Sequence, residues 1–147
     1  MKLDTVPPAD FFKLLYSNEE FCTSLGKVVL AAQGLETLLR RHMRARNSKN
    51  VRSNATLGAL VRQMKDSHLL TRNGQMHFDD LVIKRNYLAH SVYDLFHFEV
   101  AETILSRSDL VNEDVELFCE RAQALADDFN FFQELVLLAD PMQPKLL

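Results

Sequence analysis

One segment of the sequence, Lys84–Tyr93, places side chains that could do chemistry on a predicted amphipathic helix. Arg85 follows Leu81 by four residues and precedes Ala89 by four, so it falls on the apolar side of that helix. A guanidinium is costly to bury unless an anion meets it. Either a buried carboxylate supports Arg85, or Arg85 lines a cleft that receives an anion from outside. Glu36 is the natural internal partner, because the long helix predicted upstream has no other acid beyond its first turn.

Three further polar side chains lie along one flank of the same helix. Asn86 and His90 are four residues apart, and Tyr93 follows about one turn later. Arg85 and His90 lie about 140° apart on an ideal helix, so a straight helix does not present both on one face. A two-fold axis through this helix would instead bring two arginines and two histidines into one cleft.

This set of residues suits the cleavage of RNA without a metal or other cofactor. Attack of a ribose 2′-OH on the adjacent phosphate needs a base, an acid for the leaving 5′-oxygen and a cation that offsets the growing charge. His90 can fill either proton-transfer role near neutral pH. Arg85 can bind a phosphate through two donors, and Asn86 can orient the imidazole or hold a phosphate oxygen.

The spacing of Arg85 and His90, with Asn86 directly after the arginine, resembles the Arg-x(4–6)-His signature of the HEPN superfamily. Tyr93 extends the likeness to the Arg-x4-His-x-Tyr form of HepT-like toxins. The resemblance implies an all-α, usually homodimeric protein that acts as a metal-independent endoribonuclease in a toxin–antitoxin or phage-defence system. It also implies that Arg85 and His90 are catalytic, that Asn86 supports them, and that Tyr93 is a site of adenylylation by a nucleotidyltransferase-type antitoxin.

Charge is divided unevenly along the chain. Residues 1–93 carry 14 Lys and Arg against 8 Asp and Glu, whereas residues 94–147 carry 3 against 12. An acid-free basic stretch contains Arg40, Arg41, Arg44, Arg46, Lys49 and Arg52. We predict that this stretch and Lys84 bind RNA phosphates. The alternatives are a solvated helix end, where basic side chains offset the helix dipole, and a surface that meets an acidic segment.

Apolar residues recur every three or four positions over most of the chain, which predicts an antiparallel bundle of four or five helices. The predicted helices are Ala9–Tyr16, a long helix from a Ser17–Glu20 capping box to about Arg46, Thr56–Lys65, a helix that starts near Gln75, and about Asn112–Ala139. The predicted interruptions are a loop at Asn47–Asn54, a turn at Asn73-Gly74 and a break at Ser106–Asn112. We expect one HEPN-like all-α domain over residues 1–147.

The last predicted helix carries a heptad seam. Its members are Val115, Phe118, Ala122, Leu125, Phe129, Phe132 and Val136. Such a seam usually packs inside a bundle, although a phenylalanine-rich seam can also form a dimer interface.

Composition limits the class of protein. With 47% hydrophobic and 25% charged residues, the chain is typical of a soluble globular domain, and no apolar run approaches the ~18 residues that span a bilayer. The start of the sequence has no apolar secretory stretch, so we expect a cytoplasmic protein. Cys22 and Cys119 are predicted to be buried thiols, and the histidines lack the spacing of a zinc site. The alternative to a nuclease is a non-catalytic helical module that binds RNA, a nucleotide or a protein partner.

Overall fold

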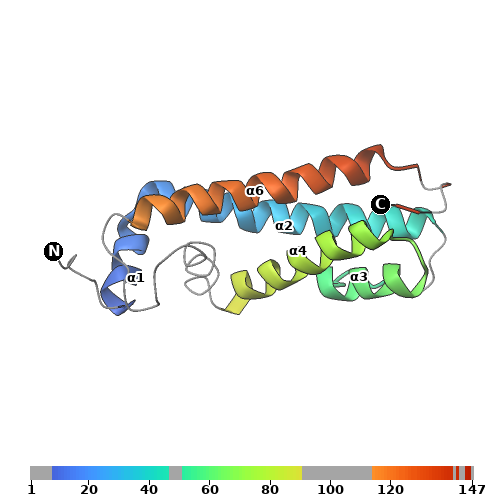
Figure 1. Cartoon of the computed structure of the whole chain (residues 1–147), viewed down its shortest axis with the longest axis horizontal. Coiled ribbons are helices and arrows are strands. Elements are labelled where there is room, and N and C mark those ends of the chain that lie inside the picture. Colours follow the sequence, from blue (N-terminus) through green and yellow to red (C-terminus); the bar gives the residue numbers. More distant parts are fainter. Residues whose placement is uncertain (1–7, 47–50, 91–113, 141, 143–144, 147) are drawn as a thin grey trace. The chain divides into compact units, whose positions relative to one another are not determined.

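The computed structural model describes residues 8–46, 51–90, 114–140, 142 and 145–146 of the 147-residue chain. The described residues form helices and no strands, which confirms the all-α prediction (Figure 1). The helices are α1 (Pro8–Ser17), α2 (Glu19–Ala45), α3 (Leu57–Asp66), α4 (Arg72–His90) and α6 (Asp114–Leu138). Among these helices, none is both long enough and apolar enough to cross a membrane.

The helices pack in two units, each with its own core. The first unit is drawn from Met1–Leu30 and Tyr87–Asp127. Its core centres on Phe118 of α6, whose ring lies edge-on to Phe11 at a centroid distance of 5.0 Å and 6.3 Å from the ring of Phe21. All three phenylalanines are almost completely buried, so this end of α2 is joined to α1 and α6 by aromatic packing.

The second unit is drawn from Ala31–Asn86 and Asp128–Leu147, and it contains Glu36, Arg85 and Asn86 of the candidate site. Here α3 lies beside α4 (Figure 1), and one apolar face of α3 is buried. The amide of Gln133 on α6 donates a hydrogen bond to the Ala31 carbonyl on α2 at 2.8 Å. The main buried side chains of this unit are Leu35, Leu39, Met43, Leu57, Leu60, Val61, Met64, Leu70, Phe78, Leu81, Phe129 and Val136.

The heptad seam of α6 is used inside these two units. Five of its members are buried, and Val115 and Phe132 are half-buried. The seam therefore serves the cores, in agreement with the first of its two predicted uses.

Three local predictions need correction. Ser17 does not cap the long helix, because it is the last residue of α1, and Asn18 Oδ1 instead accepts a hydrogen bond from Phe21 N at 2.8 Å. The turn predicted at Asn73-Gly74 lies inside the first turn of α4, because Thr71 Oγ1 accepts from Gly74 N at 3.1 Å and starts the helix earlier.

The third correction concerns a thiol. Cys22 is exposed, whereas Cys119 is buried as expected. Burial raises the pKa of Cys119, with nearby Glu20 adding to the effect. The other helices begin and end close to the predicted limits, and α3 begins one residue after the predicted Thr56 because Thr56 is its N-cap. Part of the predicted loop, residues 47–50, and the predicted break at Ser106–Asn112 lie outside the described residues.

The cap at Asn18 can be tested by substitution. Asn18→Ala should lower the free energy of unfolding by about 1 kcal/mol, because the Phe21 amide loses its acceptor. Ser17→Ala is the matched control and should change it much less. Urea denaturation of both variants measures the difference, and an equal loss in Ser17→Ala would contradict the assignment of the cap.

Candidate functional site

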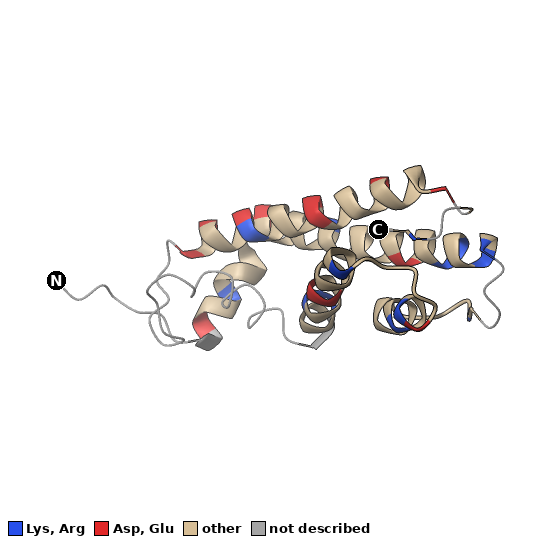
Figure 2. Cartoon of the chain, turned by 45° about the vertical axis from the view of Figure 1, so that its right-hand side comes forward, with Lys and Arg blue, Asp and Glu red and all other residues tan. Residues whose placement is uncertain are grey.

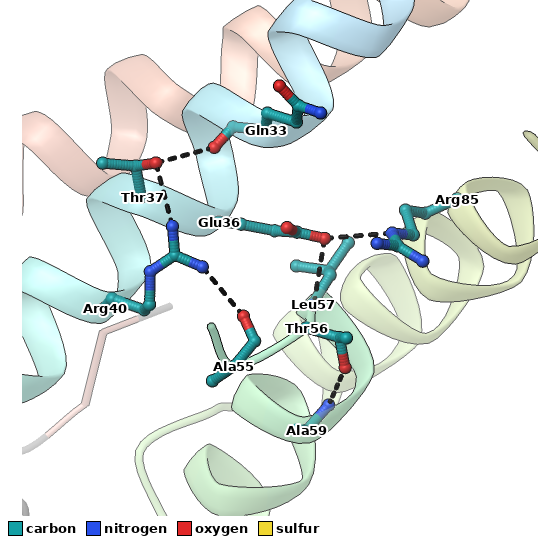
Figure 3. A network of polar contacts seen from close by, with 9 residues as sticks. All are labelled: Gln33, Glu36, Thr37, Arg40, Ala55, Thr56, Leu57, Ala59 and Arg85. Atoms are coloured by element: carbon teal, nitrogen blue, oxygen red, sulfur yellow. Dashed lines mark hydrogen bonds and ion pairs between the residues drawn. The ribbon is translucent and has the colours of Figure 1, made fainter. Parts of the chain in front are cut away.

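Arg85 lies on α4, and its guanidinium meets the internal partner expected from the sequence. Arg85 Nε donates to Glu36 Oε1 on α2 at 3.0 Å (Figure 3). The Glu36 side chain is only 10% exposed, whereas that of Arg85 is 29% exposed. A carboxylate this deeply buried needs a cation or several hydrogen-bond donors. The ion pair therefore compensates the buried charge of Glu36 at least as much as it compensates the charge of Arg85.

Glu36 also fixes the start of α3. Its Oε1 accepts a second hydrogen bond from the backbone amide of Leu57, the first residue of α3, at 3.1 Å. The amide of Ala59 is satisfied by the Thr56 side chain at 3.3 Å. Since the first amides of a helix have no partners within the helix, these two side chains satisfy two of the amides at its N-terminus. One carboxylate therefore connects α2, α3 and α4.

Arg40 secures the same segment from the next turn of α2. Its Nη1 donates to the Ala55 carbonyl at 2.9 Å, and its Nη2 donates to Thr37 Oγ1 at 3.1 Å. Thr37 in turn donates to the Gln33 carbonyl at 3.0 Å. Figure 3 shows these side chains on the side of α2 that meets the start of α3. The entry to α3 is thus held by charged donors and acceptors from α2 at Ala55 and at Leu57.

The contact with Glu36 leaves part of the Arg85 guanidinium available. Within the described residues, Glu36 is its only hydrogen-bond partner, and that bond uses Nε. The two terminal nitrogens form the fork that binds a phosphate or a carboxylate most effectively. Asn86, the next residue, is exposed and lines a cavity of about 490 Å³ between α3 and α4.

Several predicted site residues lie outside the described part of the chain. The side chain of His90, the last residue of α4, is not described, and neither are Tyr93 and Lys49. The association of Arg85 with His90 therefore stays a prediction.

Three of the predicted RNA-binding arginines, two near the end of α2 and one directly after it, are engaged with the protein's own backbone. Arg44 donates to the Val51 carbonyl at 3.5 Å, and Arg46 donates to the Asp140 carbonyl at 3.3 Å. Together with Arg40, they hold the segments that flank the basic end of α2, which is marked in blue in Figure 2.

The other predicted RNA-binding residues differ from one another in their surroundings. Arg41 and Arg52 are exposed. Lys84 forms an ion pair with Asp80 at 3.1 Å and keeps only 20% of its side chain exposed.

The structure places beside Asn86 two basic residues that the sequence analysis did not single out. Arg62 and Lys65 on α3 line the same cavity as Asn86. Their three-residue spacing on a predicted helix was a visible signal, because it places them on one face. What the sequence lacked was the packing of α3 against α4, which puts that face beside Asn86.

Among the described residues, no group of three or more His, Cys, Asp or Glu side chains is arranged to hold a metal ion. Comparison of the chain with models of protein families, with curated proteins and with solved structures finds no match. The candidate site is therefore identified from the chemistry and geometry of its own residues.

The link through Glu36 can be tested by its effect on stability. Glu36→Ala should lower the free energy of unfolding by about 2–4 kcal/mol, because the Leu57 amide and the Arg85 guanidinium both lose their acceptor. Glu36→Gln should cost less, since its amide oxygen can still accept both bonds. Glu134→Ala, at an exposed position on α6, is the control and should stay within about 0.5 kcal/mol of the parent. Equal urea midpoints for Glu36→Ala and this control would contradict the link.

A buried histidine makes stability depend on pH. His42 is 6% exposed, and its Nε2 accepts a hydrogen bond from Arg46 Nε at 2.7 Å. Burial, and then the charge of Arg46, lower the pKa of His42. The folded protein therefore keeps His42 neutral at pH values at which the unfolded chain already binds a proton.

The free energy of unfolding should thus fall as the pH drops below the ordinary histidine pKa of about 6.5, and this loss should level off below the lowered pKa of the folded state. His42→Gln cannot titrate and should reduce this dependence in urea denaturation between neutral and mildly acidic pH. His68→Asn, at an exposed position, is the control and should keep it. If the free energy of unfolding of His42→Gln depends on pH as strongly as that of the parent, His42 is not the source of this dependence.

Proposed function

We propose that this chain is a metal-independent endoribonuclease of the HEPN type that acts on RNA. The observation that supports this most directly is the state of Arg85. Its guanidinium is held by one Nε contact, its side chain is 29% exposed, and it lies five residues before His90 in the sequence. Within the described residues its two terminal nitrogens make no hydrogen bond, so they are available to bind a phosphate.

In the proposed reaction the chain's own residues supply the charge and the proton transfers. Arg85 would bind the scissile phosphate through its terminal nitrogens and stabilise the charge that grows on the phosphorane oxygens. His90 would take the proton from the 2′-OH or give one to the leaving 5′-oxygen. Asn86 would hold a phosphate oxygen or the imidazole. Glu36 is a positioning residue, because a guanidinium fixed before the substrate binds loses less freedom in the transition state.

A second copy of the chain is part of the proposal. Met76 and Ile83 on α4 are seven residues apart and are 65% and 55% exposed. The same seven-residue step leads from Ile83 to His90 in the sequence. A partner that covers this apolar stripe would therefore approach the histidine as well, and a two-fold axis there would provide two histidines.

The remaining parts of the proposal follow from the resemblance to HepT-like toxins. They are a cytoplasmic location, a role in toxin–antitoxin or phage-defence systems, and a nucleotidyltransferase-type antitoxin that modifies Tyr93.

A second function is favoured by the same ion pair. Glu36 is buried and satisfied by Arg85 and by the Leu57 amide, which suits a structural role for Arg85. The chain would then be a non-catalytic helical module that binds RNA, a nucleotide or a protein partner. In that case Arg85→Ala would mainly lower the melting temperature.

The two functions can be separated by measuring cleavage and stability on the same variants. We expect the parent chain to cleave single-stranded RNA in the presence of a chelator, and His90→Ala to reduce the rate at least about 100-fold, which is typical of the loss of a general acid or base. His90→Ala should change the melting temperature little. Arg85→Ala should lower both the rate and the melting temperature. His68→Ala is the control and should keep the activity.

If His90→Ala, or folded Arg85→Ala, cleaves RNA at the rate of the parent chain, the proposed nuclease activity is wrong. Unaltered cleavage in Glu36→Gln is compatible with it, because the guanidinium remains.

A further inference from the structure

The cavity between α3 and α4 has an unassigned polar lining. Arg62, Lys65, Asp79 and Asn86 contribute its polar and charged side chains, and its volume is about 490 Å³. We call this cavity the α3–α4 groove. All its lining residues belong to the second packing unit, and the groove is open to solvent along the exposed side chains of Arg62 and Asn86.

The charges of the groove favour an anion. The guanidinium of Arg62 has no partner among the described residues. Lys65 forms an ion pair with Asp79, and their side chains remain 35% and 49% exposed. Two cations therefore face one carboxylate.

A second cavity, of about 420 Å³ between α4 and α6, has the opposite character. Asp80 and Asp128 line it, and no Lys or Arg does. Of these two cavities, the α3–α4 groove is the one suited to a polyanion.

The groove adjoins the candidate site through the backbone of α4. Asn86 lines the groove, and the preceding residue, Arg85, pairs with Glu36 of α2, which also accepts a hydrogen bond from the first amide of α3 (Figure 3). Arg85 does not itself line the groove, but a ligand that extends beyond Asn86 would be one residue along α4 from Arg85. A chain of phosphates can occupy both places at once, whereas a single small anion cannot.

We propose that the α3–α4 groove binds the phosphodiester backbone of single-stranded RNA, with Arg62 and Lys65 contacting phosphates next to the one that reacts. A cavity of about 490 Å³ has room for a short stretch of a single strand, whose backbone can follow a positively charged groove. As a path for substrate, this inference rests on the proposed function. RNA binding in the groove, however, can be measured without cleavage.

The ion pair between Lys65 and Asp79 predicts that different substitutions change RNA affinity in opposite directions. Asp79 competes with phosphate for Lys65, so removal of its charge should strengthen RNA binding. Asp79→Asn therefore should bind more tightly than the parent, whereas Arg62→Ala and Lys65→Ala should bind more weakly.

The experiment uses the full chain and a fluorescein-labelled 2′-O-methyl oligouridylate, which lacks the attacking hydroxyl and cannot be cleaved. Fluorescence anisotropy across a range of NaCl concentrations gives the affinity and its salt dependence. Arg62→Ala and Lys65→Ala should each weaken binding several-fold and reduce the slope of log K against log salt by about 0.7, as expected for one lost phosphate contact on a single strand. Arg121→Ala, an exposed arginine on α6, removes the same charge outside the groove and should keep the slope.

The inference is overturned if Arg62→Ala and Lys65→Ala bind like Arg121→Ala, if Asp79→Asn weakens binding, or if a duplex of equal length binds more tightly than the single strand. In cleavage assays Arg62→Ala should raise KM and leave kcat unchanged, since the contact exists before and during the reaction. If the groove variants lose RNA binding but the parent cleaves no RNA, the proposed nuclease activity is wrong and the proposed RNA site in the groove stands. If cleavage depends on His90 but not on Arg62 or Lys65, the nuclease activity stands and the RNA site in the groove is wrong.

Discussion

The arrangement of the second packing unit depends on one buried carboxylate. Glu36 projects from α2, accepts from the first amide of α3 and pairs with Arg85 on α4. A carboxylate at this depth is tolerable only while both donors stay in place, so its charge constrains three helices at once. The α3–α4 groove, Asn86 and Arg85 all lie on elements that this contact holds.

The arginines of the chain divide into two groups by what their donors meet. Arg40 and Arg44 on α2, and Arg46 directly after it, bind carbonyl groups of Ala55, Val51 and Asp140, so their charge is used to hold irregular backbone.

Arg62, by contrast, has a groove in front of it, and Arg85 has a fork that Glu36 does not fill. Clustering along the sequence therefore indicates little about which cations meet a ligand, because a guanidinium near a helix end finds backbone acceptors first.

The central contact of the site was predictable, because burial of a charge leaves few choices. Arg85 falls on an apolar stripe, and beyond the first turn of the long helix Glu36 was the one acid that could pair with it. The helices themselves were also predictable from apolar periodicity. The prediction was wrong at Ser17 and at Asn73-Gly74, where a neighbouring Asn18 or Thr71 caps the helix instead. Such choices depend on which side chain reaches an amide, and several polar residues in a row satisfy the same sequence pattern.

By itself, the sequence determined the all-α class, the apolar seam of α6 and the need of Arg85 for an anion. These properties follow from the spacing of apolar and charged residues along single helices. Only the tertiary structure decided that Glu36 also caps α3, that Cys22 is exposed, and that Arg62 and Lys65 share a cavity with Asn86. These facts depend on which helix faces pack together, and residues far apart in the chain become neighbours only through that packing.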